Sequence, residues 1–343
     1  MAGKSFWYGI VGVKKLDKES YIKLARRIGL FVILAFALSF GIFIAIAVFG
    51  NFSKVLQVAS GANLYIYALA FAAVFANFLV RYGKWTYYMG KLKLKVPRLK
   101  NFAVYMSVYS MDITPGRIGR VVAAYTLSRI TKIKLPHIIP IVTMDIFTDF
   151  LGTALLALFA SLYLNRYVVY VIIIDILLLL PFAFILSDWA YNLMKDRIRK
   201  SRFLRLFTIY GDEYYASQGK LNTPRVYLTS ILFTLPAEFL NSMALYFTLR
   251  SLGIIPSISE SVFAYSSSLV FGMISGLPGG IGVTDGTLVA LLNSVYTLGP
   301  AISSAATIMA RAALLWFGVA LGAIFLFYTI RYWNPKDDKK KKK

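Results

Sequence analysis

The sequence predicts an all-α polytopic membrane protein, on the basis of its hydropathy, its charge distribution and an internal repeat. Of its 343 residues, 58% are hydrophobic, and the mean hydropathy is +0.66, which is high for a soluble domain. Several apolar segments reach or approach the ~20 residues that a helix needs to cross a bilayer. They are 29–50, 64–80, 138–164, 167–187, 226–249 and 302–330. We therefore expect about six full transmembrane helices.

The net charge of +23 is distributed unevenly along the chain. Of the 38 Lys and Arg residues, 32 lie in five stretches, namely 1–28, 81–100, 129–137, 188–225 and 331–343. Positively charged loops are retained in the cytosol, so we place these stretches and both termini on the cytosolic side of the cell membrane. There they face anionic lipid headgroups. Because no folded soluble module remains, we expect membrane lipids, and not nucleic acid, as partners.

We expect a single transmembrane domain over residues 29–330. Residues 1–28 are predicted to form a basic amphipathic segment on the cytosolic face, without a signal-peptide cleavage site, and 188–225 a similar connector. The basic tail 331–343 is predicted to be solvated and unstructured. The chain has no cysteine and one histidine, His137, which excludes thiol chemistry and the usual multi-histidine zinc site. We expect neither a metal nor a cofactor.

The two halves of the apolar region contain a related motif. An offset of 163 residues places Pro-Gly-Arg-Ile-Gly at 115–119 on Pro-Gly-Gly-Ile-Gly at 278–282. The flanking apolar segments overlap under the same offset, which predicts repeats of about 62–164 and 225–327. Proline removes a helix hydrogen bond, and glycine permits backbone angles closed to other residues. The residues expected to shape these breaks are Pro115, Gly116, Gly119, Pro278, Gly279, Gly280 and Gly282.

Residues 101–130 and 261–298 are therefore predicted to be helical hairpins broken at Pro115 and Pro278. Irregular backbone at membrane depth persists only where it is buried in protein or lines a cavity. With six spans, the first hairpin enters from the cytosol and the second from outside. The repeats are then inverted, as in many secondary transporters. Two ordinary pairs of kinked short spans are the alternative.

Acidic residues within the apolar segments are few, and each requires a partner or a polar cavity. Asp145 and Asp149 are one helical turn apart and share a face. Arg311 lies in the second repeat at the position that matches Thr148. This alignment predicts an Asp149–Arg311 contact between the repeats. The contact either binds a ligand or only fixes the helix register.

Arg117 and Arg120 follow the first Pro-Gly break, near a helix start whose dipole favours anions. The arginine fork matches phosphate, so the pair suits a lipid headgroup that enters from the cytosol; snorkelling to the interface is the alternative. Asp285 follows the second break, where it either caps a helix or binds a ligand. The predicted substrate-binding residues are Arg117, Arg120, Asp145, Asp149, Glu238, Asp285 and Arg311.

The stretch 276–285, Gly-Leu-Pro-Gly-Gly-Ile-Gly-Val-Thr-Asp, is followed by Ile-Met-Ala-Arg at 308–311. Together they resemble the flippase-like transmembrane family of the lysylphosphatidylglycerol synthetases. Thr-Pro-Gly-Arg-Ile-Gly at 114–119 and the downstream Asp149 resemble the same family's earlier signature. The resemblance covers about residues 25–330 and implies translocation of a lipid or lipid-linked molecule. It includes no aminoacyl-transferase domain, so we expect no lysylation of lipid by this chain.

The sequence departs from the family pattern at three positions. Asp285 stands where the family usually has Glu, and Arg120 where an acidic residue is common. Ile146 replaces an arginine typical of the Glu-Arg-x-x-Asp motif. Because of these departures, the resemblance does not determine the polarity of the first-half site or the exact substrate.

The sequence thus predicts a lipid flippase or transporter, not an enzyme, in which the two hairpins form a polar path. No nucleotide-binding loop is present, so transport would be downhill or coupled to an ion. One alternative is a membrane-embedded glycosyltransferase-type enzyme that acts on a lipid-linked substrate. Such chemistry usually needs outer-loop carboxylates, and the outer loop 51–63 has none. A small-solute transporter with the same architecture is the other alternative.

Overall fold

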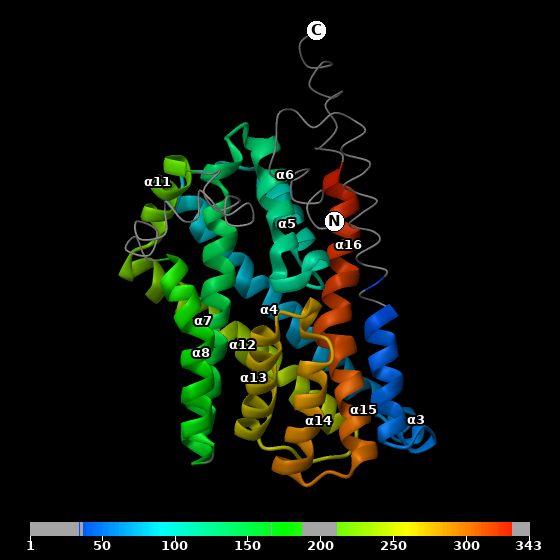
Figure 1. Ribbon diagram of the computed structural model, residues 1–343. Helices are drawn as coiled ribbons and strands as arrows, with labels where there is room; N and C mark the ends of the chain where they lie inside the picture. Colours follow the sequence, from blue (N-terminus) through cyan, green and yellow to red (C-terminus); the bar gives the residue numbers. More distant parts are fainter. Residues whose placement is uncertain (1–33, 35–36, 166, 187–210, 331–343) are drawn as a thin grey trace, which may run out of the picture.

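The computed structural model describes residue 34 and residues 37–165, 167–186 and 211–330. Within these ranges the chain forms helices joined by short turns and contains no strand, which confirms the all-α class (Figure 1). The predictions for the segment 1–28, for the first part of the connector 188–225 and for the tail 331–343 concern residues that lie outside the described ranges.

Four described helices are long and apolar enough to cross a membrane. They are α4 (Leu64–Lys91), the stretch Leu135–Leu164 that contains α7 (Ile139–Leu164), α12 (Pro224–Ser251), and the stretch Pro300–Ile330. The helix Ala37–Phe49 and α3 (Phe52–Ser60) form a further candidate that is bent by 99°. The predicted segment 167–187 corresponds to α8 (Val168–Leu186). The chain is therefore a multi-pass membrane protein.

The first long span extends beyond its predicted end at residue 80. Helix α4 continues to Lys91 and thus includes Arg81 and Lys84, which the charge distribution assigned to a cytosolic loop. Both side chains are buried, and Lys84 is fully so. The helix continues because no proline interrupts the chain before Pro97.

Each predicted Pro-Gly motif lies at a break between two helices. The first pair comprises α5 (Arg98–Ser107), the 3-10 turns η1 (Val108–Met111) and η2 (Pro115–Arg120), and α6 (Val121–Thr131). The second comprises α13 (Ile258–Ser275), the 3-10 turn η4 (Pro278–Gly280) and α14 (Val283–Tyr296). Gly279, Gly280 and Gly282 have φ angles of 59°, 66° and 88°, which only glycine adopts readily.

The two broken helix pairs approach each other from opposite ends of the bundle. Figure 1 shows α5 and α6 in the upper half and α13 and α14 in the lower half, and η2 contacts η4 where the breaks meet. Helix α4 packs along α12, and α7 packs along α13. The 163-residue offset carries α4, α5, α6 and α7 onto α12, α13, α14 and the pair α15 (Pro300–Arg311) and α16 (Phe317–Ile330).

The last long stretch of the bundle contains an irregular turn. A π-helical turn, η5 (Ala312–Trp316), joins α15 to α16 directly after Arg311, and such turns are frequent at functional sites.

The described part of the connector 188–225 forms α11 (Gly211–Leu221). This helix packs on α7 and on the 3-10 turn η3 (Leu135–His137).

Candidate functional site

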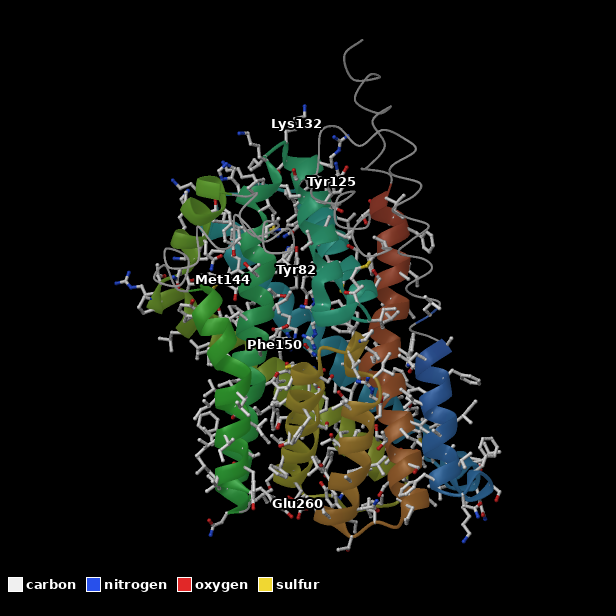
Figure 2. The ribbon with its side chains drawn as sticks, in the orientation of Figure 1. Tyr82, Tyr125, Lys132, Met144, Phe150 and Glu260 are labelled. Carbon is white, nitrogen blue, oxygen red and sulfur yellow. The ribbon has the colours of Figure 1, made fainter. Side chains whose placement is uncertain are left out.

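A polar pocket lies where the two helix breaks meet. It has a volume of about 90 Å³ and is lined by residues from both broken pairs and from α4, α7, α12 and α15. Phe150 is one of the lining residues, and Figure 2 places it between Lys132 near one end of the molecule and Glu260 near the other. The pocket is therefore close to the middle of the bundle.

Asp149 on α7 forms the centre of a buried charge cluster beside this pocket. Its carboxylate contacts Arg81 and lies 2.5 Å from Lys84 Nζ, and none of these side chains is more than 7% exposed. Its other oxygen is 3.4 Å from Arg120 Nη1 and 3.5 Å from Arg117 Nη1. One carboxylate thus links α4 and η2 to α7 and offsets the charge of several buried cations.

Asp145 and Asp112 form further ion pairs with cations of this cluster. Asp145 lies 3.0 Å from both Lys84 Nζ and Arg120 Nη1. Arg120 also donates to Asp112 through Nε at 2.7 Å and Nη2 at 2.9 Å. All three guanidinium nitrogens of Arg120 are therefore engaged by carboxylates. Asp145 and Asp149 do share a face, and the cations that meet this face come from α4 and η2.

Glu238 on α12 completes the cluster. It pairs with Arg81 at 2.5 Å and accepts hydrogen bonds from Thr153 Oγ1 at 2.9 Å and Asn241 Nδ2 at 3.1 Å. Arg81 also donates from Nε to Asn77 at 2.7 Å. As far as the chain is described, the cluster thereby contains four cations, Arg81, Lys84, Arg117 and Arg120, and four carboxylates, Asp112, Asp145, Asp149 and Glu238. This balance offsets the desolvation cost of charges buried at membrane depth.

Arg311 pairs with Asp285 and not with Asp149, which corrects the contact predicted between the repeats. Arg311 Nε lies 2.7 Å from Asp285 Oδ1, and Arg311 Nη2 donates to the Gly279 carbonyl at 2.8 Å. Asp285 also accepts the Gly282 N–H at 2.7 Å, so it caps α14 as well as binding Arg311. The prediction was wrong because the second break supplies its own carboxylate, while Asp149 is engaged by cations of α4 and η2.

The pocket does not expose every residue that the sequence singled out. Arg117, Arg120, Glu238 and Arg311 line it, as do Gly279 and Gly280. Asp145, Asp149 and Asp285 lie behind this lining, where they form the ion pairs described above. Their carboxylates therefore position the arginines that face the pocket.

Sequence reasoning missed Arg81, Lys84 and Asp112. Arg81 and Lys84 follow the predicted apolar segment 64–80, so the prediction assigned both to a loop. The spacing of Asn77, Arg81, Lys84 and Tyr88 nevertheless places all four on one side of a helix. That polar stripe was the available signal for a continued span. Asp112 had no comparable signal because it precedes the Pro-Gly break in an irregular segment.

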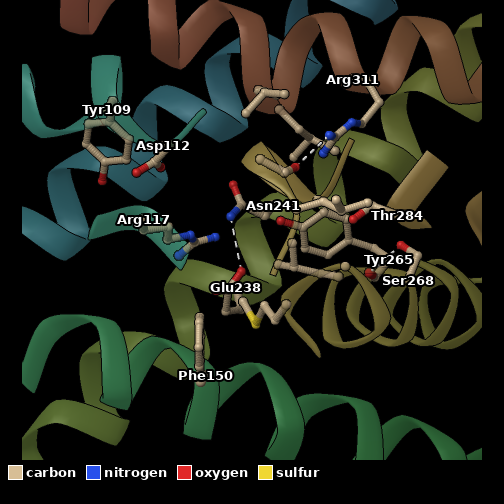
Figure 3. Close-up of a pocket in the computed structure, with 18 of the residues that line it drawn as sticks. Tyr109, Asp112, Arg117, Phe150, Glu238, Asn241, Tyr265, Ser268, Thr284 and Arg311 are labelled. Carbon is tan, nitrogen blue, oxygen red and sulfur yellow. Dashed lines mark hydrogen bonds between the residues drawn. The ribbon is translucent and has the colours of Figure 1, made fainter. Parts of the chain in front are cut away.

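Arg117 differs from the other cations of the cluster. Among the described residues its one carboxylate contact is Asp149 at 3.5 Å, and its side chain remains 19% exposed. Its φ angle of 55° lies in the left-handed region, which non-glycine residues adopt rarely and often at functional sites. Figure 3 shows Arg117 and Arg311 directed into the pocket from different elements. Arg117 is thus placed to donate to a ligand.

Within the described ranges, no group of three or more His, Asp or Glu side chains is arranged to hold a metal ion. The clustered carboxylates instead face arginine and lysine side chains.

The fold and the site define a multi-pass membrane protein with balanced buried charges at the junction of two broken helix pairs. The chain belongs to the family described as the lysylphosphatidylglycerol synthase TM region, whose model matches residues 32–322. This match confirms the family resemblance carried by the two Pro-Gly motifs and Asp149. No individual curated protein matches the chain significantly.

Proposed function

We propose that this protein moves a phosphate-bearing lipid headgroup between the leaflets of the cytoplasmic membrane, through the pocket between its two helix breaks. The observation that carries the proposal is the position of Arg117. Its guanidinium faces the pocket, and within the described part of the chain it has a single long carboxylate contact, at 3.5 Å. Arginine binds phosphate through a planar fork of donors.

Release of Arg117 to a ligand would not leave a buried carboxylate uncompensated. Asp149, its partner, retains the contact with Arg81 and the 2.5 Å contact with Lys84. The remaining cations are held more firmly, since Arg120 makes carboxylate contacts with all three of its guanidinium nitrogens. Arg117 is therefore the cation of the cluster that a phosphate recruits at the lowest electrostatic cost.

The pocket would have to widen to admit a headgroup. Its volume of about 90 Å³ is well below the ~300–1,000 Å³ that is usual for sites of small ligands. A headgroup would enter when the two breaks separate, because η2 and η4 contact each other beside the pocket. Opening first on one side and then on the other would carry the headgroup across.

The orientation of this path follows from the charges at the two ends. The α5–α6 end carries Arg98, Lys100, Arg129, Lys132 and Lys134, whereas the turn between α12 and α13 is flanked by one basic residue, Arg250, and one acidic residue, Glu260. The positive-inside rule places the α5–α6 end and both termini in the cytosol. The two broken pairs then act as inverted re-entrant hairpins, and their approach from opposite ends supports this arrangement.

The proposal is tested by reconstitution of the protein in liposomes with a fluorescent anionic phospholipid. A membrane-impermeant reductant then reports how fast the inner-leaflet probe reaches the outer leaflet. The wild-type protein should move the probe faster than protein-free liposomes. Arg117→Gln should slow movement about tenfold or more, because hydrogen bonds to a charged group contribute ~1.5–3 kcal/mol.

Arg250→Gln is the matched control, because Arg250 is an exposed arginine at the end of α12. It should move lipid at the wild-type rate. Absence of lipid movement by the wild-type protein would contradict the proposal. Equal rates for wild type and Arg117→Gln would remove the headgroup role of Arg117.

A further inference from the structure

A second cavity, of about 460 Å³ and widely open to the outside of the bundle, lies between the helix Ala37–Phe49 and α14. The first helix contributes Ile42, Ile46 and Phe49, and α14 contributes Gly286, Ala290 and Asn293. The lining is apolar except for Asn293, whose side-chain oxygen accepts a hydrogen bond from Ser303 at 2.9 Å. We call this cavity the lateral groove. Its walls can therefore make apolar contacts, and they contain few polar groups that could bind an ion or a polar solute.

The inner end of the lateral groove adjoins the polar pocket. Gly282 lines the groove, whereas Gly279 and Gly280 of the same turn line the pocket. The second helix break is therefore the wall between the two cavities. Arg311 holds this wall from the pocket side by donating to the Gly279 carbonyl, and Asp285 holds it by accepting the Gly282 N–H.

We propose that the lateral groove binds one acyl chain of the lipid whose headgroup enters the polar pocket. This inference rests on the proposed function and adds a second contact region for the same substrate. The groove's volume of about 460 Å³ lies within the ~300–1,000 Å³ that is usual for small-ligand sites, and its apolar lining suits one acyl chain. A lipid seated in this way straddles the second helix break, with its polar and apolar parts on opposite sides.

The position of the groove also favours an acyl chain over other occupants. The helix Ala37–Phe49 belongs to a candidate membrane span, and α14 follows the break near the middle of the bundle. At this depth the surrounding solvent is hydrocarbon, so lipid chains are the abundant apolar molecules. A lipid that is not bound keeps both of its acyl chains in the bilayer. If the lateral groove binds one acyl chain, the headgroup of that lipid is held beside the second helix break.

Gly286 gives a means of blocking the groove without disturbing the protein. A Cβ atom added there would meet no atom within 4 Å, so the space beside it belongs to the groove. Gly286→Leu should therefore fill part of the groove. Gly41→Leu is the matched control, because Gly41 lies on the helix Ala37–Phe49, is exposed and has equally open surroundings, but does not line the groove.

The test uses an anionic phospholipid with a diazirine in the middle of one acyl chain, in liposomes that contain the full chain. After illumination, mass spectrometry locates the labelled residues. We expect labels concentrated at 42–49 and 286–293 in the wild-type protein and in Gly41→Leu. Gly286→Leu should lose most of this labelling and should move the fluorescent phospholipid several-fold more slowly than Gly41→Leu.

Labels spread evenly over the outward faces of α4 and α16 would show an ordinary lipid-facing surface and would overturn the inference. An unlabelled groove, as expected if another part of the chain occupies it, would overturn it too. So would equal lipid movement by Gly286→Leu and Gly41→Leu. If Arg117→Gln is still slow in that case, the proposed function stands and only the acyl-chain site fails. Absence of lipid movement by the wild-type protein would instead contradict the proposed function.

Discussion

Arg311 and Asp285 join α15 to the first turn of α14 through an ion pair of 2.7 Å. The same two side chains hold the backbone of the second break, Arg311 at the Gly279 carbonyl and Asp285 at the Gly282 N–H. The second break is therefore fixed by its own charge pair. The first break is fixed differently, because Arg117 and Arg120 form ion pairs with carboxylates of α7 and with Asp112.

Removal of the charge at Arg311 should destabilise the protein strongly. Arg311→Ala leaves the fully buried Asp285 carboxylate without its cation, and this should lower the free energy of unfolding by about 3–5 kcal/mol. Addition of Asp285→Asn should recover much of the loss, because asparagine is neutral and its oxygen still accepts the Gly282 N–H. Unfolding in detergent, followed by circular dichroism, measures both variants.

The same experiment distinguishes the two possible partners of Arg311. Asp149→Asn combined with Arg311→Ala should show no recovery, because Asp149 is bound by Arg81 and Lys84. Recovery with Asp149→Asn, and none with Asp285→Asn, would restore the pairing predicted from the sequence repeat.

Lys84 should contribute far more to the stability of the protein than an exposed lysine does. Its ammonium group is fully buried between Asp145 and Asp149. Lys84→Met should therefore cost about 3–5 kcal/mol in the free energy of unfolding. Lys95→Met, at an exposed position in the turn before α5, should change it by less than about 0.5 kcal/mol. Equal effects of the two substitutions would contradict the buried position of Lys84.

The orientation in the membrane can be measured with single cysteines, since the chain contains none. Lys132 is exposed beside α6, and Ile255 is 84% exposed in the turn between α12 and α13. In intact cells an impermeant maleimide should modify Ile255→Cys, and it should reach Lys132→Cys only after permeabilisation. The reason is the excess of positive charge at the α5–α6 end. The reverse pattern would invert the proposed topology.

The helix breaks were predictable from the sequence because their cause is local. Pro278 cannot donate a helix hydrogen bond, and Gly279 and Gly280 adopt positive φ angles, so the residues themselves specify an interruption. The correspondence of helices under the 163-residue offset follows from the same pattern of spans and breaks.

The partners within the charge cluster were not predictable because they depend on packing between distant helices. Hydropathy treats Arg81 and Lys84 as the end of a span, since it does not register the carboxylates of Asp149 and Glu238 that compensate them. A repeat alignment likewise places Arg311 opposite Thr148 but does not show that Asp285 lies closer. Residue types in this site were recognisable from the sequence, whereas their pairing required the fold.

On the proposed path, lipid headgroups pass between the two helix breaks. Ile113 and Ile281 flank these breaks and pack in one buried cluster. The variant Ile113→Cys/Ile281→Cys, bridged by a short bis-methanethiosulfonate reagent, should hold the breaks together. Mass spectrometry measures the bridged fraction, and each single-cysteine variant treated in the same way serves as the control.

The decisive measurement is the rate of phospholipid movement in liposomes before bridging, after bridging and after reduction. The bridged protein should move lipid no faster than protein-free liposomes, and reduction should restore the original rate. The single-cysteine variants should be unaffected by the reagent. A fully bridged protein that moves lipid at the unbridged rate would show that the headgroup takes another path.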